Sequence, residues 1–476
     1  MSARNLAISK RGLTLGVALF LAGCASVTPQ QSIQAVNAAT GNFVGESVAL
    51  RATDPARADA REKVKSMLAA PLGQADAVKV MLLNSAAFQA LLAQGVADSA
   101  AAAQLGRIQN PSLSIERMTS AADIELTRVL SFGLLDILTL PQRNKIAEQA
   151  IDASHLQLAS TVVQAVANVK RAWVEAVAAE AAYHYAGQVM RSANASAELA
   201  ARMQRVGNLT VLARSSQQMY AADAAVNLAA AQHQRHKTRE GLIRLLGLRY
   251  DQQALLTLPK RLVMLPEAPR PVEEVNAQLV SARLDVRISA HQLTVAAKAQ
   301  GLGDVTSFTD IEWGIRRTST TERGDGAVAT SSGNEISIKL PLFDWGDLQR
   351  SRMAAQTLGA INAYEAAALM ASSEVREAYS AYRTAFDIAQ HYQQEIIPLR
   401  QRMSEENQYR YNGMMIGTLE LLADARMQVG VVQSALKATE QFWLAEAALG
   451  ESLISSPTAG FMLSGATASA ASAGGH

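Results

Sequence analysis

The chain has 476 residues, of which 49% are hydrophobic and only 5% are aromatic, and its formal net charge is +2. This length can bury a large core, and the shortage of aromatic side chains favours long, closely packed helices over one globule. The near-neutral charge and the lack of a basic patch interleaved with aromatic residues exclude a nucleic-acid partner. Beyond the first 24 residues no run of eighteen apolar residues occurs, which excludes a helical membrane span there.

The first 24 residues are typical of a bacterial targeting segment. Arg4, Lys10 and Arg11 form a positive region, an apolar stretch covers 13–21, and the segment ends in Leu-Ala-Gly-Cys. This ending resembles a lipobox, which predicts removal of a signal peptide, residues 1–23, and lipidation of Cys24. Because Cys24 is the only cysteine, an intramolecular disulfide and a cysteine-based metal site are excluded. An ordinary signal peptide with an incidental cysteine is the alternative. No Asp follows the cysteine, which favours anchoring in the outer membrane.

Residues 24–74 are expected to be an N-terminal arm. The segment 25–60 is rich in Gln, Ala and Ser and has no clear periodicity, so an extended chain leading away from the anchor is predicted. A helix is predicted over 76–105, where apolar residues recur at helical spacing. Asn110-Pro111 is expected to stop that helix.

Two stretches far apart in the chain share one pattern, a pair of strands that leads into a long helix, and this indicates an internal repeat. In the first stretch, alternation of apolar and polar residues predicts strands over 112–118 and 124–137, with Arg128 interrupting the apolar face. The helix that follows opens with Gln142–Gln149, which resembles Gln349–Gln356 in the second stretch.

The second strand pair is predicted over 305–317 and 335–342 by the same alternation. Between these strands, residues 318–333 are rich in Gly, Ser and Thr and are predicted to form a long exposed loop. The Phe343–Asp347 segment supplies a turn, and a helix is expected from Leu348 onward.

Each strand pair is followed by two long helices. A helix over 142–206 would measure roughly 95 Å, which is too long to stand without coiled-coil or solenoid packing. Breaks at Gly207-Asn208 and Gly413–Gly417 predict hairpins of antiparallel helices, with Gly247 as a C-cap and Pro398 bending the second long helix. The first repeat is assigned to 75–258, a proline-rich linker to 259–271 and the second repeat to 272–456. The low-complexity tail, 457–476, is expected to be disordered.

Four strands cannot close a barrel, and a sheet with open edges is not tolerated in lipid. Three chains would supply twelve strands, which lies within the range of closed outer-membrane barrels. Polar residues would then face a wet lumen, and the lipid-facing residues would be Ile311, Trp313, Ile315, Ile336, Ile338 and Leu340. A soluble helical bundle capped by the two hairpins is the alternative.

The order and spacing of these features resemble the TolC-like outer membrane efflux proteins, in their lipoprotein branch, over roughly residues 75–453. The matching segments are NPSLSIE (110–116), RVGNLTVL (205–212), LPLFDWG (340–346) and NGMMIGTLELLADAR (412–426). The resemblance implies a mainly α chain with a small β part, two tandem hairpin-and-helix repeats, and a homotrimeric twelve-stranded barrel continued by an α-helical periplasmic tunnel. It also implies a periplasmic adaptor and an inner-membrane pump as partners, with passive export of drugs or metal ions.

The same resemblance implies a pore constriction near the second helical break, where Glu420 and Asp424 are four residues apart and would share one helix face. Solvated surface acids are the alternative for this pair. The adaptor-docking tips would be formed by Gly207, Asn208, Leu209, Gly413, Met414 and Met415.

No catalytic motif, cofactor or metal site is predicted. His233 and His236 are three apart but lie in a charged, solvated stretch, and a copper(I) site at Met414-Met415 is the alternative to apolar docking. Two other functions stay open: a protein-secretion duct, and a non-conducting periplasmic coiled-coil scaffold anchored by Cys24.

Overall fold

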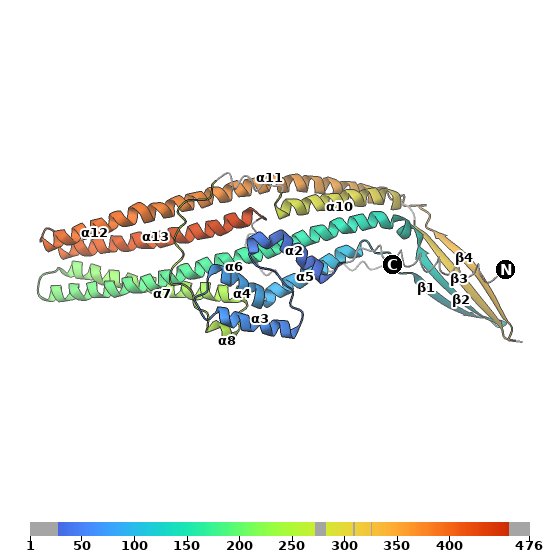
Figure 1. Ribbon diagram of the computed structural model, residues 1–476, viewed down its shortest axis with the longest axis horizontal. Helices are drawn as coiled ribbons and strands as arrows, with labels where there is room; N and C mark the ends of the chain where they lie inside the picture. The colour runs from blue at the N-terminus through green and yellow to red at the C-terminus, as the bar shows by residue number, and fades with distance from the viewer. Residues whose placement is uncertain (1–26, 272–281, 308–309, 325, 457–476) are drawn as a thin grey trace.

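The computed structural model describes residues 27–271, 282–307, 310–324 and 326–456. Cys24, the signal peptide, the first ten residues of the second repeat (272–281) and the tail 457–476 lie outside the described residues. The molecule is elongated, with a sheet at one end and two helical hairpin tips at the other (Figure 1). The elements before the second repeat are α2 (Pro29–Val44), α3 (Asp54–Met67), α4 (Gln74–Asn84), α5 (Ala86–Gln104), β1 (Ser112–Thr119), β2 (Asp123–Gly133), α6 (Leu134–Arg205), α7 (Val211–Leu246) and α8 (Tyr250–Gln253). The second repeat contains α10 (Leu284–Thr306), β3 (Ile311–Glu322), β4 (Val328–Ile338), α11 (Asp347–His391), the π turn η2 (Tyr392–Ile396), α12 (Ile397–Asn412) and α13 (Thr418–Ser452).

Helix α6 is the spine of the molecule, with 72 residues that run from the sheet to the first hairpin tip (Figure 1). It begins eight residues earlier than predicted, directly after β2, and keeps Pro141 inside its first two turns. Asp136 in the first turn is favourable at the positive end of the helix dipole, and Arg143, two residues beyond Pro141, pairs with it. The predicted strand over 124–137 is therefore too long, because its last four residues are helical.

The N-terminal segment folds back onto this spine, so the prediction of an extended arm is wrong. Thr28 and Gln31 form a capping box that starts α2, in which the Thr28 hydroxyl accepts from the Gln31 amide at 3.3 Å. Ile33, Val36 and Val44 of α2 are buried in the main core, which lies around the middle of α6.

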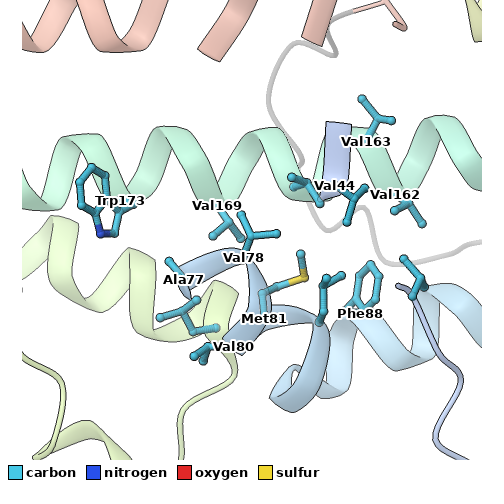
Figure 2. Close-up of a cluster of buried hydrophobic side chains, with 14 of the residues drawn as sticks. Val44, Ala77, Val78, Val80, Met81, Phe88, Val162, Val163, Val169 and Trp173 are labelled. Atoms are coloured by element: carbon cyan, nitrogen blue, oxygen red, sulfur yellow. The ribbon is translucent and has the colours of Figure 1, made fainter. Parts of the chain in front are cut away.

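Figure 2 shows this core, in which side chains from the N-terminal helices pack against the spine. Val78, Met81 and Phe88 from α4 and α5 belong to the same buried cluster as Val162 and Trp173 of α6. The Trp173 indole N–H donates to the carbonyl oxygen of Leu72 at 2.8 Å, so the ring is buried with its polar atom satisfied.

One helix was expected over 76–105, but two are present, bent by 63° at Ser85. The end of α7 lies against this break: Gly247 adopts φ 65°, and a Cβ there would meet the Ser85 Cα at 2.7 Å. The Asn84 side chain donates to the Gly247 carbonyl oxygen at 2.7 Å. The break is thus set by tertiary contact, while the predicted C-cap role of Gly247 is confirmed. Among the described helices, none alone has the length and apolar composition of a membrane span, and the bent pair α4–α5 has them together.

The four strands form one antiparallel sheet in the order β1-β2-β3-β4, with continuous registers. The prediction of a long exposed loop over 318–333 is wrong, because β3 runs to Glu322 and pairs with β4 from Val328. These Ser- and Thr-rich residues suit strands, but their two faces are equally polar and give no alternation to detect. At the other end β4 stops at Ile338, and residues 305–306, predicted as strand, belong to α10.

The helices of the second repeat are joined by a buried arginine. Arg283 is 1% exposed and pairs with Asp285 of α10 and Glu374 of α11, at 2.7 Å and 2.6 Å. Its guanidinium also donates to the carbonyl oxygens of Ala371 and Ser452, so one side chain ties α10, α11 and the end of α13 together. A bend is expected at Pro398, and the structure has a π turn immediately before α12, whose second residue is that proline.

The two repeats are connected by a second buried ion pair, between Arg171 of α6 and Glu451 of α13. Glu451 is fully buried, and its Oε1 has no hydrogen-bond partner within the described residues. Burial raises the pKa of this carboxyl above its ordinary value, and the Arg171 guanidinium opposes that change only in part.

A raised pKa in the folded state means that Glu451 contributes stability that is present below its unfolded pKa and is lost as pH rises through the folded pKa. Glu451→Gln imitates the neutral form. We therefore expect the difference in unfolding midpoint, variant minus wild type, to increase by about 1–3 °C between pH 4 and pH 7. Circular dichroism of the detergent-solubilised protein measures it.

Glu198→Gln is the matched control, because Glu198 lies exposed on α6 and is also paired with an arginine. Both side chains of that pair are exposed, so its midpoint difference should change less than that of Glu451→Gln. A difference for Glu451→Gln that does not increase with pH would contradict the assigned effect of burial.

Candidate functional site

The first helical tip connects α6 to α7 at the end of the molecule opposite the sheet (Figure 1). Gly207 adopts φ 80°, which only glycine takes without strain, and the Asn208 amide donates to the Met203 carbonyl oxygen at 2.9 Å. Thr210 then caps α7 by accepting from the Ala213 amide at 3.2 Å. Gly207 and Asn208 are exposed and Leu209 is half-buried, so this predicted tip presents mostly backbone and polar groups.

The second tip connects α12 to α13 and lies beside the first (Figure 1). Here the left-handed residue is Met414, with φ 59°, whereas the preceding Gly413 has an ordinary φ of −78°. Within the described part of the chain, Met414 is the only residue other than glycine with a positive φ. Its side chain is 93% exposed and Met415 is also exposed, so a strained turn displays two thioether side chains to solvent.

Glu420 and Asp424, predicted to line one passage, lie in different environments. Glu420 is exposed in the first turn of α13. Asp424 is 2% exposed, and its Oδ1 accepts from Arg400 Nη2 at 2.5 Å and from Asn407 Nδ2 at 2.9 Å. The expectation that both carboxylates share one open face is therefore corrected for Asp424, because α12 covers it. Arg400 lies 24 residues away, so no local sequence signal reveals the pair.

A separate contact joins the two helical hairpins. Arg426 of α13 donates to Gln217 Oε1 of α7 at 2.5 Å, and its guanidinium lies 4.4 Å from the centre of the Tyr220 ring. Neither partner on α7 was predicted from the sequence. Their helical spacing of three residues places them on one face, but only the packing of α13 against α7 identifies them.

The other candidate surface is the sheet, whose strands place alternate residues on two faces. One face, here called the apolar face, carries Leu113, Ile115, Leu130, Phe132, Ile311, Trp313, Ile315, Ile336 and Ile338. Five of the six residues predicted to contact lipid are therefore on one face, and Leu340 follows in the loop after β4. Phe132 and Trp313 stack there with ring centres 6.2 Å apart.

The opposite, polar face carries carboxylates, hydroxyls and one arginine. Thr127 and Thr318 are cross-strand partners joined through their hydroxyls at 3.1 Å. Arg316 pairs with Glu335 at 2.9 Å, and the other carboxylates leave this face with an excess of negative charge. The sheet thus separates an apolar side from a charged, hydrated side.

No candidate for metal chemistry appears among the described residues, where no group of three or more His, Cys, Asp or Glu side chains could hold an ion. His233 and His236 are exposed on α7. Arg235 between them pairs with Glu180 of α6 at 2.7 Å, which fits the charged, solvated surface expected there.

No protein-family model matches the sequence, and no curated protein sequence matches it. Solved structures do match. A membrane protein from Pseudomonas aeruginosa is 18% identical with a TM-score of 0.67, over 80% of this chain and 93% of that one. The CmeC outer membrane channel of Campylobacter jejuni is 13% identical with a TM-score of 0.66, over 86% and 89%. The MtrE outer membrane channel of Neisseria gonorrhoeae is 17% identical with a TM-score of 0.63, over 82% and 88%.

Because the Arg400–Asp424 ion pair is buried, loss of one partner should have a larger effect than loss of a partner from an exposed pair. Asp424→Asn leaves a buried guanidinium without its anion, so local opening of α12 from α13 should become easier by about 3–5 kcal/mol. Hydrogen exchange of the backbone amides over 397–424 measures that opening.

Asp387→Asn serves as the control, because Asp387 pairs with Arg383 on the exposed surface of α11. Its effect should stay within about 1 kcal/mol. Equal exchange in the two variants would show that Asp424 is not held as the structure describes.

Proposed function

We propose that this chain, which has the fold of the TolC-like outer-membrane channels, is the outer-membrane exit duct of a tripartite efflux system. In this proposal three copies form a twelve-stranded barrel, the long helices continue it as a periplasmic tunnel, and Cys24 anchors each copy by a lipid. A periplasmic adaptor and an inner-membrane pump would supply the energy, and the cargo would be small molecules such as drugs or metal ions. No catalytic step is assigned to the chain.

The observation that carries the proposal is the incomplete sheet. Strands β1 and β4 are its two edges, and every residue of both strands is exposed. Unpaired strand edges are not tolerated in lipid, and they promote aggregation in water. Pairing β1 of one copy with β4 of the next removes both edges, and three copies would close a barrel of ordinary size. The polar face would then line the lumen.

The helices of the second repeat support the same assembly. Only four of the 45 residues of α11 are buried, although the helix carries many large apolar side chains. Leu348, Leu358, Leu369 and Met370 are all exposed. Several large apolar side chains exposed along one helix suit an interface, and neighbouring copies in a helical tunnel would cover them.

The hairpin tips would be the point of contact with the adaptor. The proposed docking residues are Gly207, Asn208, Leu209, Gly413, Met414 and Met415, which lie at the end remote from the sheet. Methionine side chains adapt to different partner surfaces, and a strained, exposed turn is typical of a functional site.

Glu420 is the residue proposed to narrow the passage, since it is exposed one turn from the second tip whereas Asp424 is covered. Three symmetry-related carboxylates would attract multivalent cations at the constriction. Arg426 would hold the two hairpins of one copy together in the closed form through Gln217 and Tyr220.

The function is tested by reconstitution in planar bilayers. Wild type should run as a trimer in SDS without heating and should conduct.

Glu420→Gln should weaken block by a trivalent cation by about tenfold or more, because it removes the charge that binds the ion. Asp424→Asn should weaken block much less than Glu420→Gln, because that carboxylate is buried within the subunit. A monomer that never conducts contradicts the duct, and equal effects of both variants contradict the constriction.

Opening is tested with Arg426→Ala. This change removes a charge-assisted hydrogen bond and a cation–π contact, together about 2–3 kcal/mol per subunit, so the closed form should lose stability and mean conductance should rise several-fold. Gln217→Ala keeps the contact with Tyr220 and should give a smaller rise. Unchanged conductance in Arg426→Ala, with the trimer intact, would exclude this contact from the closed state.

A further inference from the structure

Three arginines interrupt the apolar face of the sheet, in two adjacent rows of the strand register. Arg128 of β2 and Arg317 of β3 are direct cross-strand partners, and both side chains are exposed. Arg117 of β1 is exposed on the same face, in the adjacent row of the register, opposite Leu126. The proposed channel function does not use any of these three guanidinium groups.

No carboxylate in the described strands can neutralise them. The acidic residues of the strands are all at positions of the polar face: Glu116, Asp123, Glu125, Glu312, Glu322 and Glu335. The fourth strand arginine, Arg316, is on that polar face and is already paired with Glu335. Because side chains alternate along the strands, all the carboxylates lie on the polar face and three unpaired arginines lie on the apolar face.

Closure of the sheet by a second copy does not supply an anion either. The partner edge would be β4, whose residues on the apolar face are Val328, Thr330, Ser332, Asn334, Ile336 and Ile338. Like charges directly opposite each other on a sheet are destabilising. The Arg128–Arg317 pair therefore needs an anion from outside the protein.

The position of the cluster indicates the source of that anion. Three apolar rows precede it on the side of the long helices: Ile311 with Ile338, then Phe132, Trp313 and Ile336, then Leu113, Leu130 and Ile315. Arginine on a lipid-facing strand is strongly unfavourable at the middle of the bilayer and nearly neutral at its interface. The cluster thus marks the edge of the apolar layer nearer the hairpin turns, where lipid headgroups lie.

We propose that Arg117, Arg128 and Arg317 form a binding site for the phosphate groups of anionic lipid in the leaflet next to the hairpin turns. Planar guanidinium groups bind phosphate oxygens in pairs, and their aliphatic stems lie along apolar surface while the charge reaches the headgroup. The trimer would carry three such sites on its circumference. This inference rests on the proposed barrel, since it requires the apolar face to contact lipid.

The experiment uses the full-length trimer, purified in neutral detergent, and native mass spectrometry to measure bound lipid. The probes are a bis-phosphorylated outer-leaflet glycolipid, the same glycolipid without phosphates, phosphatidylglycerol and inorganic phosphate. The test variant is Arg128→Gln with Arg317→Gln. Arg316→Gln is the control, because it removes a positive charge next to Arg317 on β3 but from the polar face. Planar-bilayer conductance is recorded for each preparation.

Wild type and Arg316→Gln should bind the phosphorylated glycolipid with equal affinity, and the double variant at least about tenfold more weakly. The dephosphorylated glycolipid should bind all three proteins equally and weakly. Stronger binding of phosphatidylglycerol than of the glycolipid would support the site and assign it to phospholipid. Equal binding by the double variant, or displacement of the lipid by millimolar inorganic phosphate, would overturn the proposal. If the trimer conducts and either of these two results is found, only the lipid-binding proposal is wrong. If the protein does not conduct, the proposed channel function is wrong.

Discussion

The structure depends on backbone hydrogen bonds that a single chain leaves unmade. A four-stranded sheet has two edges, and here the outer strands β1 and β4 offer a full row of unpaired groups on each side. Water is an unfavourable solvent for the apolar face, and lipid offers no hydrogen-bond partners to the unpaired strand edges. In the proposed assembly, strands from neighbouring copies would satisfy both conditions. The long helices would then carry a sheet that the assembly completes.

The helices position this sheet because one of them is continuous with it. Helix α6 starts at the residue after β2, so no flexible loop separates the strand from this 72-residue helix. The second repeat lacks such a junction, since eight residues separate β4 from α11. Buried charge compensates there: Arg283 holds α10 and α11 to the end of α13, and Arg171 holds α13 to the spine through Glu451. Such pairs are costly to break, which fixes the register of the two repeats.

Elements encoded by long periodic patterns could be predicted from the sequence. Features set by a single tertiary contact could not. Long helical periodicity gave both hairpins and their breaks, and alternation gave the inner portions of all four strands. The first helix could have been found, because Thr28 and Gln31 form a capping-box pattern before an apolar stripe. The bend at Ser85 could not, since it depends on the end of α7 at Gly247. The burial of Asp424 likewise depends on which helix covers it, and no local pattern encodes that.

The two contacts at the tips differ in strength, and this difference decides which parts can move. Within the second hairpin, Arg400 and Asp424 form a buried ion pair between α12 and α13. Between the hairpins, Arg426 contacts a neutral amide and an aromatic ring on α7. Separating the buried ions leaves two charges without solvent, whereas separating Arg426 from Gln217 exposes groups that water can satisfy. We infer that each hairpin moves as one rigid unit, and that any opening of the tip occurs at the α7–α13 contact.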